Sequence, residues 1–258
     1  MKNWLKKAAL AVAVAGSGMA FGNDEVSVRD LSGKNVVLVH GAWADGSSWS
    51  RVIPILEARG LHVVSVQIPL TSLEDDLAAT RRVLLQQKGP VILVGHSWGG
   101  AVITEAGAAA NVKALVYVAA FAPDKGQSVN DLQKGAPPAP WMSSLQVDSG
   151  GYTTLATDAF IANFAPDLPR GEARILAATQ VPWYSGSLDE KIVVAAWRTK
   201  PSWFVITGQD HIIPTQAQDA MALGIHAHAV HVNSSHVVML SHPQEVAETI
   251  VEAARESQ

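Results

Sequence analysis

Residues 91–100 read Val-Ile-Leu-Val-Gly-His-Ser-Trp-Gly-Gly, and this stretch decides the fold. Its first four residues are apolar and mostly branched, which predicts a buried strand, and the small residues at its end predict the start of a helix. Between strand and helix stands the pattern Gly95-x-Ser97-x-Gly99, which is typical of a sharp, strained turn that lifts a serine hydroxyl above the edge of a sheet. We interpret both glycines as required by the tight turn, because side chains there would collide with the strand and the helix.

Outward from this turn, strands and helices alternate along the chain. Short apolar runs predict strands at 35–40, 61–68, 91–94, 114–121, 203–207 and 227–232. The spacing of apolar residues predicts helices at 50–59, 72–87, 98–110 and 243–256. Because each strand is a continuous apolar run and helices separate the strands, we expect an α/β fold with a mostly parallel sheet covered by helices on both faces.

The segment 123–200 interrupts this alternation. It shows no buried strand, it is rich in proline and aromatic residues, and it is too long for a loop. We therefore predict a small helical cap, inserted before the penultimate strand, between core segments 23–122 and 201–258. Such a cap would cover the carboxyl ends of the strands, where open α/β sheets bind ligands. The candidate residues of a substrate pocket beneath it are Trp43, Trp141, Phe164 and Trp183.

A serine hydroxyl is a weak nucleophile unless a base removes its proton. Five of the nine histidines lie near the C-terminus, and His236 is the one placed in the loop between the last strand and the final helix. Asp210 follows the fifth strand, and the order Ser97, Asp210, His236 is that of serine–acid–histidine triads on this kind of sheet. Asp124, after the fourth strand, is a second candidate for the acid. A metal site is a rival interpretation of the histidines, but no cysteine and no local acidic ligand accompanies them.

Attack on a carbonyl also requires hydrogen-bond donors for the oxyanion. The backbone N–H of Trp98, directly after the serine, is one candidate. The loop after the first strand supplies the other, because Gly41 permits a close approach of the backbone and so presents the N–H of Ala42. We interpret His40 and His96 as structural residues that bond the backbone around these two turns.

From residue 35 to the C-terminus the sequence resembles compact α/β-hydrolases, the group that includes plant methylesterases, salicylate-binding esterases and hydroxynitrile lyases. The shared motifs are Val-His-Gly-Ala-Trp at 39–43, the turn at Ser97, Ala-Ala-Phe-Ala-Pro at 119–123, Gly-Gln-Asp at 208–210 and Ser-His at 235–236. The resemblance implies a nucleophile, an acid and a base at Ser97, Asp210 and His236, with no cofactor. From the residues themselves we expect no metal.

These residues favour hydrolysis of a small, fairly apolar carboxylic ester or lactone through an acyl-enzyme. Cyanohydrin cleavage is an alternative, although the lyases in this group have a lysine after the histidine and a threonine in the oxyanion loop. Here Val237 follows His236, and the loop reads Gly-Ala-Trp-Ala at 41–44. Another cofactor-free activity on the same fold, or a ligand-binding protein with slow turnover, are further alternatives.

Composition narrows the function classes. The chain has 258 residues, no cysteine and a net charge of −4. The absence of cysteine excludes disulfides, thiolate metal sites and a cysteine nucleophile. The sequence has no cluster of basic residues that would attract the phosphate groups of a nucleic acid, so nucleic-acid binding is not expected. We expect a small-molecule ester as the partner, and a monomer or a homodimer.

The N-terminus carries the pattern of a secretory signal. Lys2, Lys6 and Lys7 precede an apolar run at 8–16 that is too short to span a membrane. Small residues follow, which places cleavage between Ala20 and Gly22 and predicts a signal peptide at 1–22. Its removal takes away three lysines and no acidic residue, and so moves the net charge from −4 to −7. We expect export to a bacterial periplasm or secretion with no stable membrane anchor; a wrongly assigned start of a cytoplasmic protein is the alternative.

Overall fold

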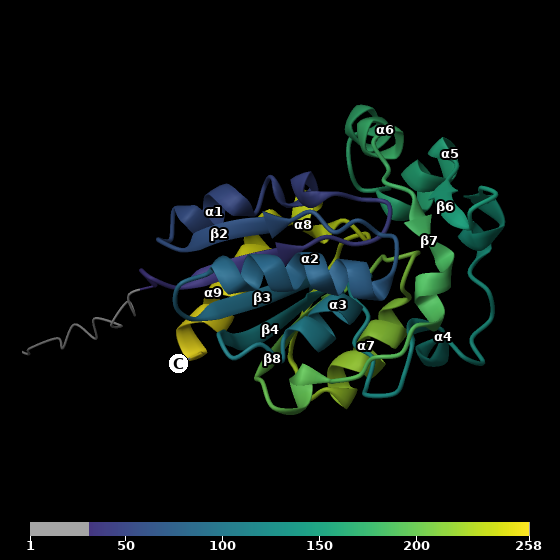
Figure 1. The fold of residues 1–258 in the computed structure, drawn as a ribbon. Coiled ribbons are helices and arrows are strands. Elements are labelled where there is room, and N and C mark those ends of the chain that lie inside the picture. The colour runs from purple at the N-terminus through teal and green to yellow at the C-terminus, as the bar shows by residue number, and fades with distance from the viewer. Residues whose placement is uncertain (1–30, 258) are drawn as a thin grey trace, which may run out of the picture.

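The computed structural model describes residues 31–257, and the predicted signal peptide at 1–22 lies outside them. In this range the central sheet has six strands in the order β2-β1-β3-β4-β8-β9, and all neighbours are parallel (Figure 1). Their bounds are Asn35–Val39 (β1), His62–Val66 (β2), Val91–His96 (β3), Val112–Val118 (β4), Ser202–Thr207 (β8) and His228–Val232 (β9). All six predicted strands are confirmed, with ends shifted by at most three residues.

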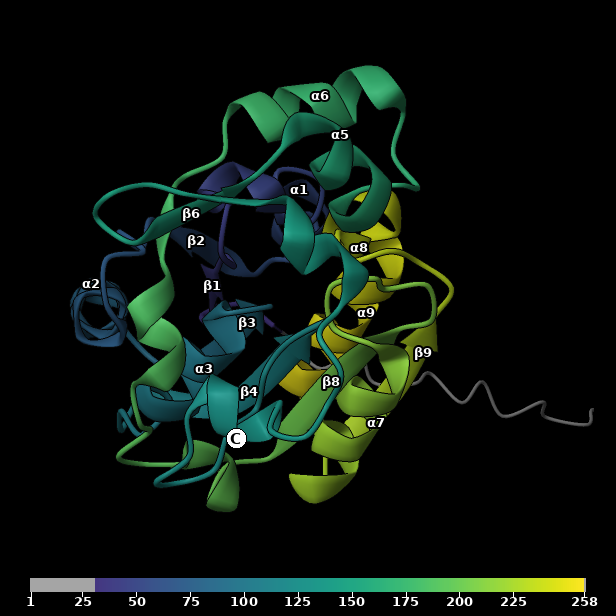
Figure 2. The ribbon, with the colours of Figure 1, turned by 90° about the vertical axis from the view of Figure 1, so that its right-hand side faces the viewer.

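Helices cover both faces of this sheet, as predicted. Figure 2 shows α1 and α9 on one face and α2, α3 and α7 on the other. The bounds are Ile53–Glu57 (α1), Leu73–Gln86 (α2), Gly99–Ala106 (α3), Thr215–Gly224 (α7), Val238–Ser241 (α8) and Pro243–Glu256 (α9). A single short 3₁₀ turn, η1 (Gly46–Trp49), follows β1. The side chain of Ser72 caps α2 by accepting from the N–H of Asp75, which begins this helix at the predicted place.

The inner strands are buried, as expected for parallel strands that have helices on both faces of the sheet. Every residue of β1, β3 and β8 is buried, whereas the edge strand β9 is exposed along most of its length. None of the helices within residues 31–257 combines the length and the apolar character that crossing a membrane would require.

The segment between β4 and β8 contains more than helices. Its helices and turns are Val129–Leu132 (α4), Thr157–Ala159 (α5), Arg170–Ala178 (α6), Pro140–Ser144 (η2), Phe160–Phe164 (η3), Ser185–Asp189 (η4) and Ala196–Arg198 (η5). It also forms a three-stranded antiparallel sheet from Leu145–Val147 (β5), Tyr152–Leu155 (β6) and Trp183–Tyr184 (β7). The sequence does not predict this sheet, because strands of two to four residues are too short to show an alternating pattern.

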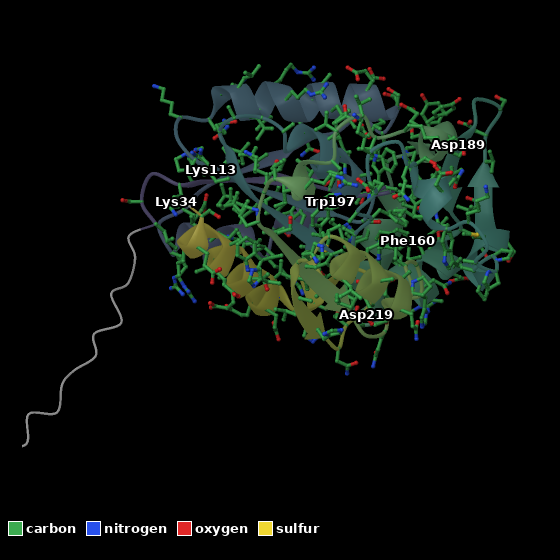
Figure 3. The ribbon with its side chains drawn as sticks, turned by 90° about the horizontal axis from the view of Figure 1, so that it is seen from below. Lys34, Lys113, Phe160, Asp189, Trp197 and Asp219 are labelled. Atoms are coloured by element: carbon green, nitrogen blue, oxygen red, sulfur yellow. The ribbon has the colours of Figure 1, made fainter. Side chains whose placement is uncertain are left out.

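The inserted segment lies at the carboxyl ends of the parallel strands. Lys34 and Lys113 mark the ends where β1 and β4 begin, and Figure 3 places Phe160 and Asp189 of the insert at the opposite end of the molecule. The turn that carries Ser97 follows β3 at that same end. The insert therefore covers the edge of the sheet where the predicted functional residues lie.

Candidate active site

Ser97 sits in a strained turn between β3 and α3. Its φ angle is 52°, in the left-handed region that residues with a side chain rarely adopt. A Cβ added to Gly95 would lie 2.5 Å from the carbonyl oxygen of Gly99, and one added to Gly99 would lie 2.7 Å from the carbonyl oxygen of His40. Both glycines are therefore required by space, as the sequence predicts.

Backbone hydrogen bonds with β4, with the loop after it and with α3 hold this strained conformation. The N–H of Ser97 donates to the carbonyl of Val118 at 3.2 Å, and its carbonyl accepts from the N–H of Phe121 at 3.1 Å and from the N–H of Gly100 at 3.0 Å. The surrounding structure thus determines where the hydroxyl lies. The side chain is almost buried, with the residue 5% exposed.

His236 and Asp210 form a buried pair at the end of the sheet. His236 Nδ1 and Asp210 Oδ2 are 2.8 Å apart, and neither side chain has any exposed surface. The other ring nitrogen, Nε2, is buried and has no hydrogen-bond partner among the described residues. A histidine held in this way has one nitrogen oriented by a carboxylate and the other available for a substrate or a nucleophile.

Four further donors fix the carboxylate of Asp210. Its Oδ1 accepts from the N–H groups of Ile212 at 2.7 Å and Ile213 at 3.0 Å. Its Oδ2 accepts from Thr207 Oγ1 and from Gln218 Nε2, both at 2.9 Å. These bonds satisfy the carboxylate in a buried place and direct one of its oxygens at His236.

Asp124, the second candidate for the acid, lies elsewhere. Its carboxylate forms an ion pair with Arg198, whose Nε donates to it at 2.7 Å. The hydrogen bond from Arg198 lowers the pKa of Asp124. Of the two candidates, the structure brings Asp210 and not Asp124 to His236.

The structural interpretation of His40 and His96 agrees with their contacts. His96 Nε2 donates to the carbonyl of His236 at 2.9 Å. His40 Nε2 accepts from the N–H of Ile68 at 3.1 Å, and its Nδ1 donates to the carbonyl of Gly41 at 2.9 Å. Burial lowers the pKa of both rings, that of His96 well below its ordinary value. Both rings are therefore neutral near pH 7 and serve to hold the backbone.

The backbone N–H groups of Ala42 and Trp98 are available to a ligand. Within residues 31–257 neither donates a backbone hydrogen bond. Both residues line one cavity together with Ser97. Two unpaired donors beside a serine hydroxyl are the arrangement that stabilises negative charge on a carbonyl oxygen during attack.

That cavity has a volume of about 250 Å³ and aromatic walls. Three of the four predicted pocket residues, Trp43, Trp141 and Trp183, line it. Trp43 stands between the other two, with both ring centroids 5.8 Å from its own in edge-to-face contact.

Phe164, the fourth predicted pocket residue, does not line this cavity. Its ring packs edge-on against His236, with 4.9 Å between centroids, and lies 6.1 Å from Trp43. The π-helical turn η3 places it over the histidine rather than over the space beside Ser97. Among the described residues, no group of three or more histidine, aspartate or glutamate side chains is arranged to hold a metal ion.

Asp167, in the insert, anchors the loop that carries His236, and the sequence does not reveal it. Its Oδ2 accepts from the N–H of Ser235 at 2.9 Å and from Ser234 Oγ at 3.0 Å, and its Oδ1 accepts from Ser235 Oγ. Burial alone would raise the pKa of Asp167, but these hydrogen bonds outweigh it and leave the pKa below its ordinary value. The insert thereby sets the position of the residues directly before His236.

We expect Asp167→Ala to lower kcat about tenfold with little change in KM, because the His236 loop loses three hydrogen bonds while the cavity walls stay in place. Asp158→Ala is the matched control, since Asp158 is an exposed acid of the same insert that pairs only with Arg170. Steady-state kinetics on one ester would compare them. Equal kcat values for the two variants would show that Asp167 does not position His236.

Asp76, on the first turn of α2, supports the cavity wall from behind. Its Oδ2 accepts from Trp98 Nε1 at 2.7 Å, and its Oδ1 accepts from the N–H of Leu70 at 2.8 Å. Burial, opposed in part by these hydrogen bonds, raises the pKa of Asp76 to about 6. In the sequence this residue is one of three acids at a helix start, where acids usually lie in solvent and favour the helix dipole.

This raised pKa predicts a pH dependence of stability. The contribution of Asp76 is fully present below the ordinary pKa near 4 and is lost as the pH rises through about 6. The free energy of unfolding of the wild type, minus that of Asp76→Asn, should therefore fall by about 2–3 kcal/mol between pH 4 and pH 7. Urea titrations of both proteins would measure it. A difference that stays constant with pH would contradict the raised pKa.

The sequence is similar to a family of known proteins and to individual relatives. The family model described as "Alpha/beta hydrolase family" matches residues 36–249. A carbendazim-hydrolyzing esterase of Nocardioides sp. is 33% identical over 141 residues, which is 48% of this chain and 56% of that esterase, so the match spans about half of that relative. Salicylic acid-binding protein 2 of Nicotiana tabacum is 26% identical over 86% of this chain and 97% of its own length.

Solved structures agree in fold. The pyrethroid hydrolase of Sphingobium faniae superposes with a TM-score of 0.74 at 21% identity, over 86% of this chain and 98% of that one. An extracellular α/β-hydrolase of a Paenibacillus species gives a TM-score of 0.74 at 23% identity, over 86% and 99%. At identities of 21% and 23%, the similarity to these structures shows the fold alone.

Proposed function

Because the chain belongs to the alpha/beta hydrolase family, we propose that it hydrolyses carboxylic esters with Ser97 as the nucleophile, His236 as the base and Asp210 as the acid of a triad. One observation carries the proposal. A buried histidine, oriented by a fixed carboxylate at 2.8 Å and with its second nitrogen unpartnered, belongs to the same sheet edge as a strained serine that lines a cavity.

In the proposed reaction, Ser97 attacks the ester carbonyl while His236 Nε2 takes the hydroxyl proton. Asp210 holds the Nδ1–H of the ring and stabilises the imidazolium that forms. The N–H groups of Ala42 and Trp98 donate hydrogen bonds to the carbonyl oxygen and so stabilise the negative charge that develops on it. His236 then protonates the leaving alcohol, and a water molecule activated by the same nitrogen releases the acid from the acyl-enzyme.

The proposed substrate is an ester or lactone with an apolar group beside the carbonyl. The cavity at Ser97 supports this, because indole rings form much of its wall and its volume of about 250 Å³ suits a small group. Relatives named a carbendazim-hydrolyzing esterase and a pyrethroid hydrolase support hydrolysis as the reaction. Hydrolysis is favoured over cyanohydrin cleavage, because Val237 follows His236 where the lyases of the resembled group have a lysine.

We also propose that the protein is exported. The support is the predicted signal peptide at 1–22, with its basic start and its apolar run. A periplasmic or secreted location would place the enzyme where esters from outside the cell first arrive.

A panel of p-nitrophenyl esters, with lactones and the matching amides, tests the proposed reaction. We expect turnover of esters, little or none of amides, and covalent labelling by a fluorophosphonate probe that adds its mass to the peptide containing Ser97. A protein that turns over no ester and takes up no probe does not have the proposed activity.

A further inference from the structure

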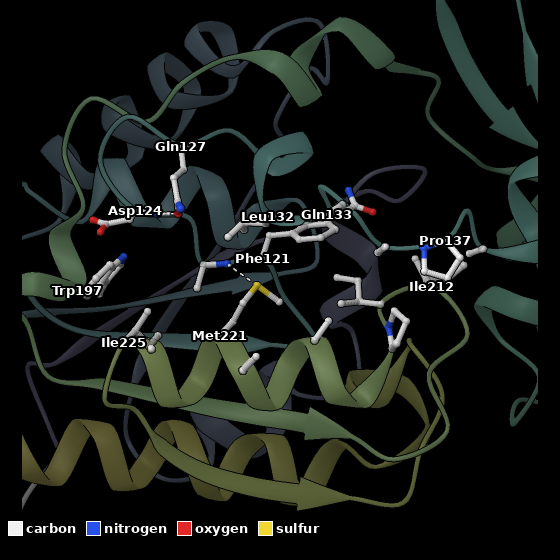
Figure 4. Close-up of a pocket in the computed structure, with 18 of the residues that line it drawn as sticks. Phe121, Asp124, Gln127, Leu132, Gln133, Pro137, Trp197, Ile212, Met221 and Ile225 are labelled. Atoms are coloured by element: carbon white, nitrogen blue, oxygen red, sulfur yellow. Dashed lines mark hydrogen bonds between the residues drawn. The ribbon is translucent and has the colours of Figure 1, made fainter.

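A second and larger cavity adjoins the one at Ser97. It has a volume of about 400 Å³ and lies between α7 and the segment that follows β4 (Figure 4). We call it the outer chamber, and the cavity at Ser97 the inner chamber. Its volume alone falls in the range of pockets that bind small molecules.

The two chambers meet beside the proposed catalytic residues. Four residues line both chambers: Phe121, Gln133, Met142 and Ile212. The N–H of Phe121 donates to the carbonyl of Ser97 at 3.1 Å. The N–H of Ile212 donates to the carboxylate of Asp210 at 2.7 Å. Two residues of the junction are thus hydrogen-bonded to Ser97 and to Asp210. The junction therefore lies next to the place where an ester bond would be cleaved.

One face of α7 forms the floor of the outer chamber. Ala217, Ala220, Met221 and Gly224 all line it, and their spacing of three and four residues places them on one side of a helix. Figure 4 shows Met221 reaching up from this face to accept a hydrogen bond from the N–H of Ala122, at 3.4 Å. Small side chains and a flexible thioether leave a smooth apolar floor.

The chamber offers no charge to a ligand. Among the described residues that line it, the single charged one is Asp124, whose carboxylate is already paired with Arg198. Gln127 is also engaged, since its Oε1 accepts from the N–H of Asp124 at 2.9 Å. A carboxylate or phosphate group would find no cation here, whereas a neutral apolar group would find walls of matching chemistry.

We propose that the outer chamber binds a long apolar group of the same ester whose carbonyl lies at Ser97. The substrate class is then an ester with apolar groups on both sides of the reacting bond, one in each chamber. This inference rests on the proposed function, and it goes beyond that function in requiring a second, extended group.

The test uses a bulky substitution at an exposed position of α7 to fill the outer chamber. Ala217→Trp places an indole on the chamber side of α7, and Gln216→Trp is the matched control, exposed on the same helix but outside the lining. Two ester series are compared: p-nitrophenyl esters from acetate to octanoate, and acetates from methyl to octyl followed by acid release. Thermal unfolding of both variants checks that the fold is intact.

In the wild type we expect kcat/KM to rise along one of these series, by up to about fourfold for each methylene. Ala217→Trp should lower the ratio of kcat/KM between the longest and the shortest ester of that series at least tenfold, and Gln216→Trp should leave the ratio as in the wild type. Two results would overturn the inference. One is a wild-type kcat/KM that does not depend on chain length in either series, and the other is an unchanged ratio in Ala217→Trp.

A binding measurement separates this inference from the proposed function. In a Ser97→Ala background, calorimetry with p-nitrophenyl octanoate and octyl acetate should show at least tenfold weaker binding of one of them when Ala217→Trp is added. If the wild type hydrolyses no ester but this loss of binding is found, the proposed function is wrong and the apolar site stands. If esters are hydrolysed and binding is unchanged, the outer chamber is not a substrate site.

Discussion

Ser97→Ala should abolish ester hydrolysis and leave the fold intact. The expected loss in kcat is about 10⁴- to 10⁶-fold, the range found when a triad nucleophile is removed and oxyanion donors remain. The fold should persist because alanine keeps the Cβ and the three backbone hydrogen bonds that hold the turn at Ser97. Turnover of p-nitrophenyl acetate, with thermal unfolding of the same sample, measures both effects.

A second serine provides the control for this substitution. Ser202 is 3% exposed, lies at the start of β8 and donates only to the carbonyl of Lys200, at 3.3 Å. Ser202→Ala removes a buried hydroxyl of the same kind far along the sheet from the turn, and should keep kcat within about twofold of the wild type. If Ser97→Ala kept a tenth or more of the wild-type rate, the nucleophile would have to be sought elsewhere.

The turn at Ser97 could be predicted from the sequence because its requirements are short-range. The clash that excludes a side chain at Gly95 is with Gly99, four residues on. The approach of Asp210 to His236 could be predicted because each lies in the loop after a strand, and the carboxyl ends of parallel strands share one edge. Placing them there needed the order of elements along the chain and no knowledge of how side chains pack.

What could not be predicted depends on contacts between distant segments. Asp167 reaches the His236 loop across 68 positions of sequence. Phe164 was expected in the pocket on its aromatic character alone, but a π-helical turn directs it over His236. The outer chamber exists because α7 and the segment after β4 leave space between them, and neither segment shows this by itself. Local patterns locate strands, turns and reactive residues, whereas cavity shape follows from packing.

Asp210→Asn should lower kcat by about 10⁴-fold although the side chain keeps its size. Asp210 Oδ1 accepts two backbone N–H groups, from Ile212 and Ile213, and only an oxygen can replace it there. The amide nitrogen of the asparagine must then take the place of Oδ2, 2.8 Å from His236 Nδ1. It would donate to that nitrogen and so force the ring proton onto Nε2. A ring with its proton on Nε2 cannot accept the proton of Ser97.

The chain offers a matched control in a second acid–histidine pair. Asp219 and His231 are 2.7 Å apart but exposed, so Asp219→Asn makes the same chemical change where solvent surrounds the pair. It should leave kcat unchanged. Asp210→Asn should unfold at a lower temperature than the wild type, because its amide nitrogen then faces Gln218 Nε2, but it should be folded at the assay temperature and yet lose activity. The expected loss of activity follows from the tautomer of His236, and ¹⁵N spectra of the ring would show the proton on Nε2 in the variant. An active Asp210→Asn enzyme with that tautomer would mean that His236 is not the base.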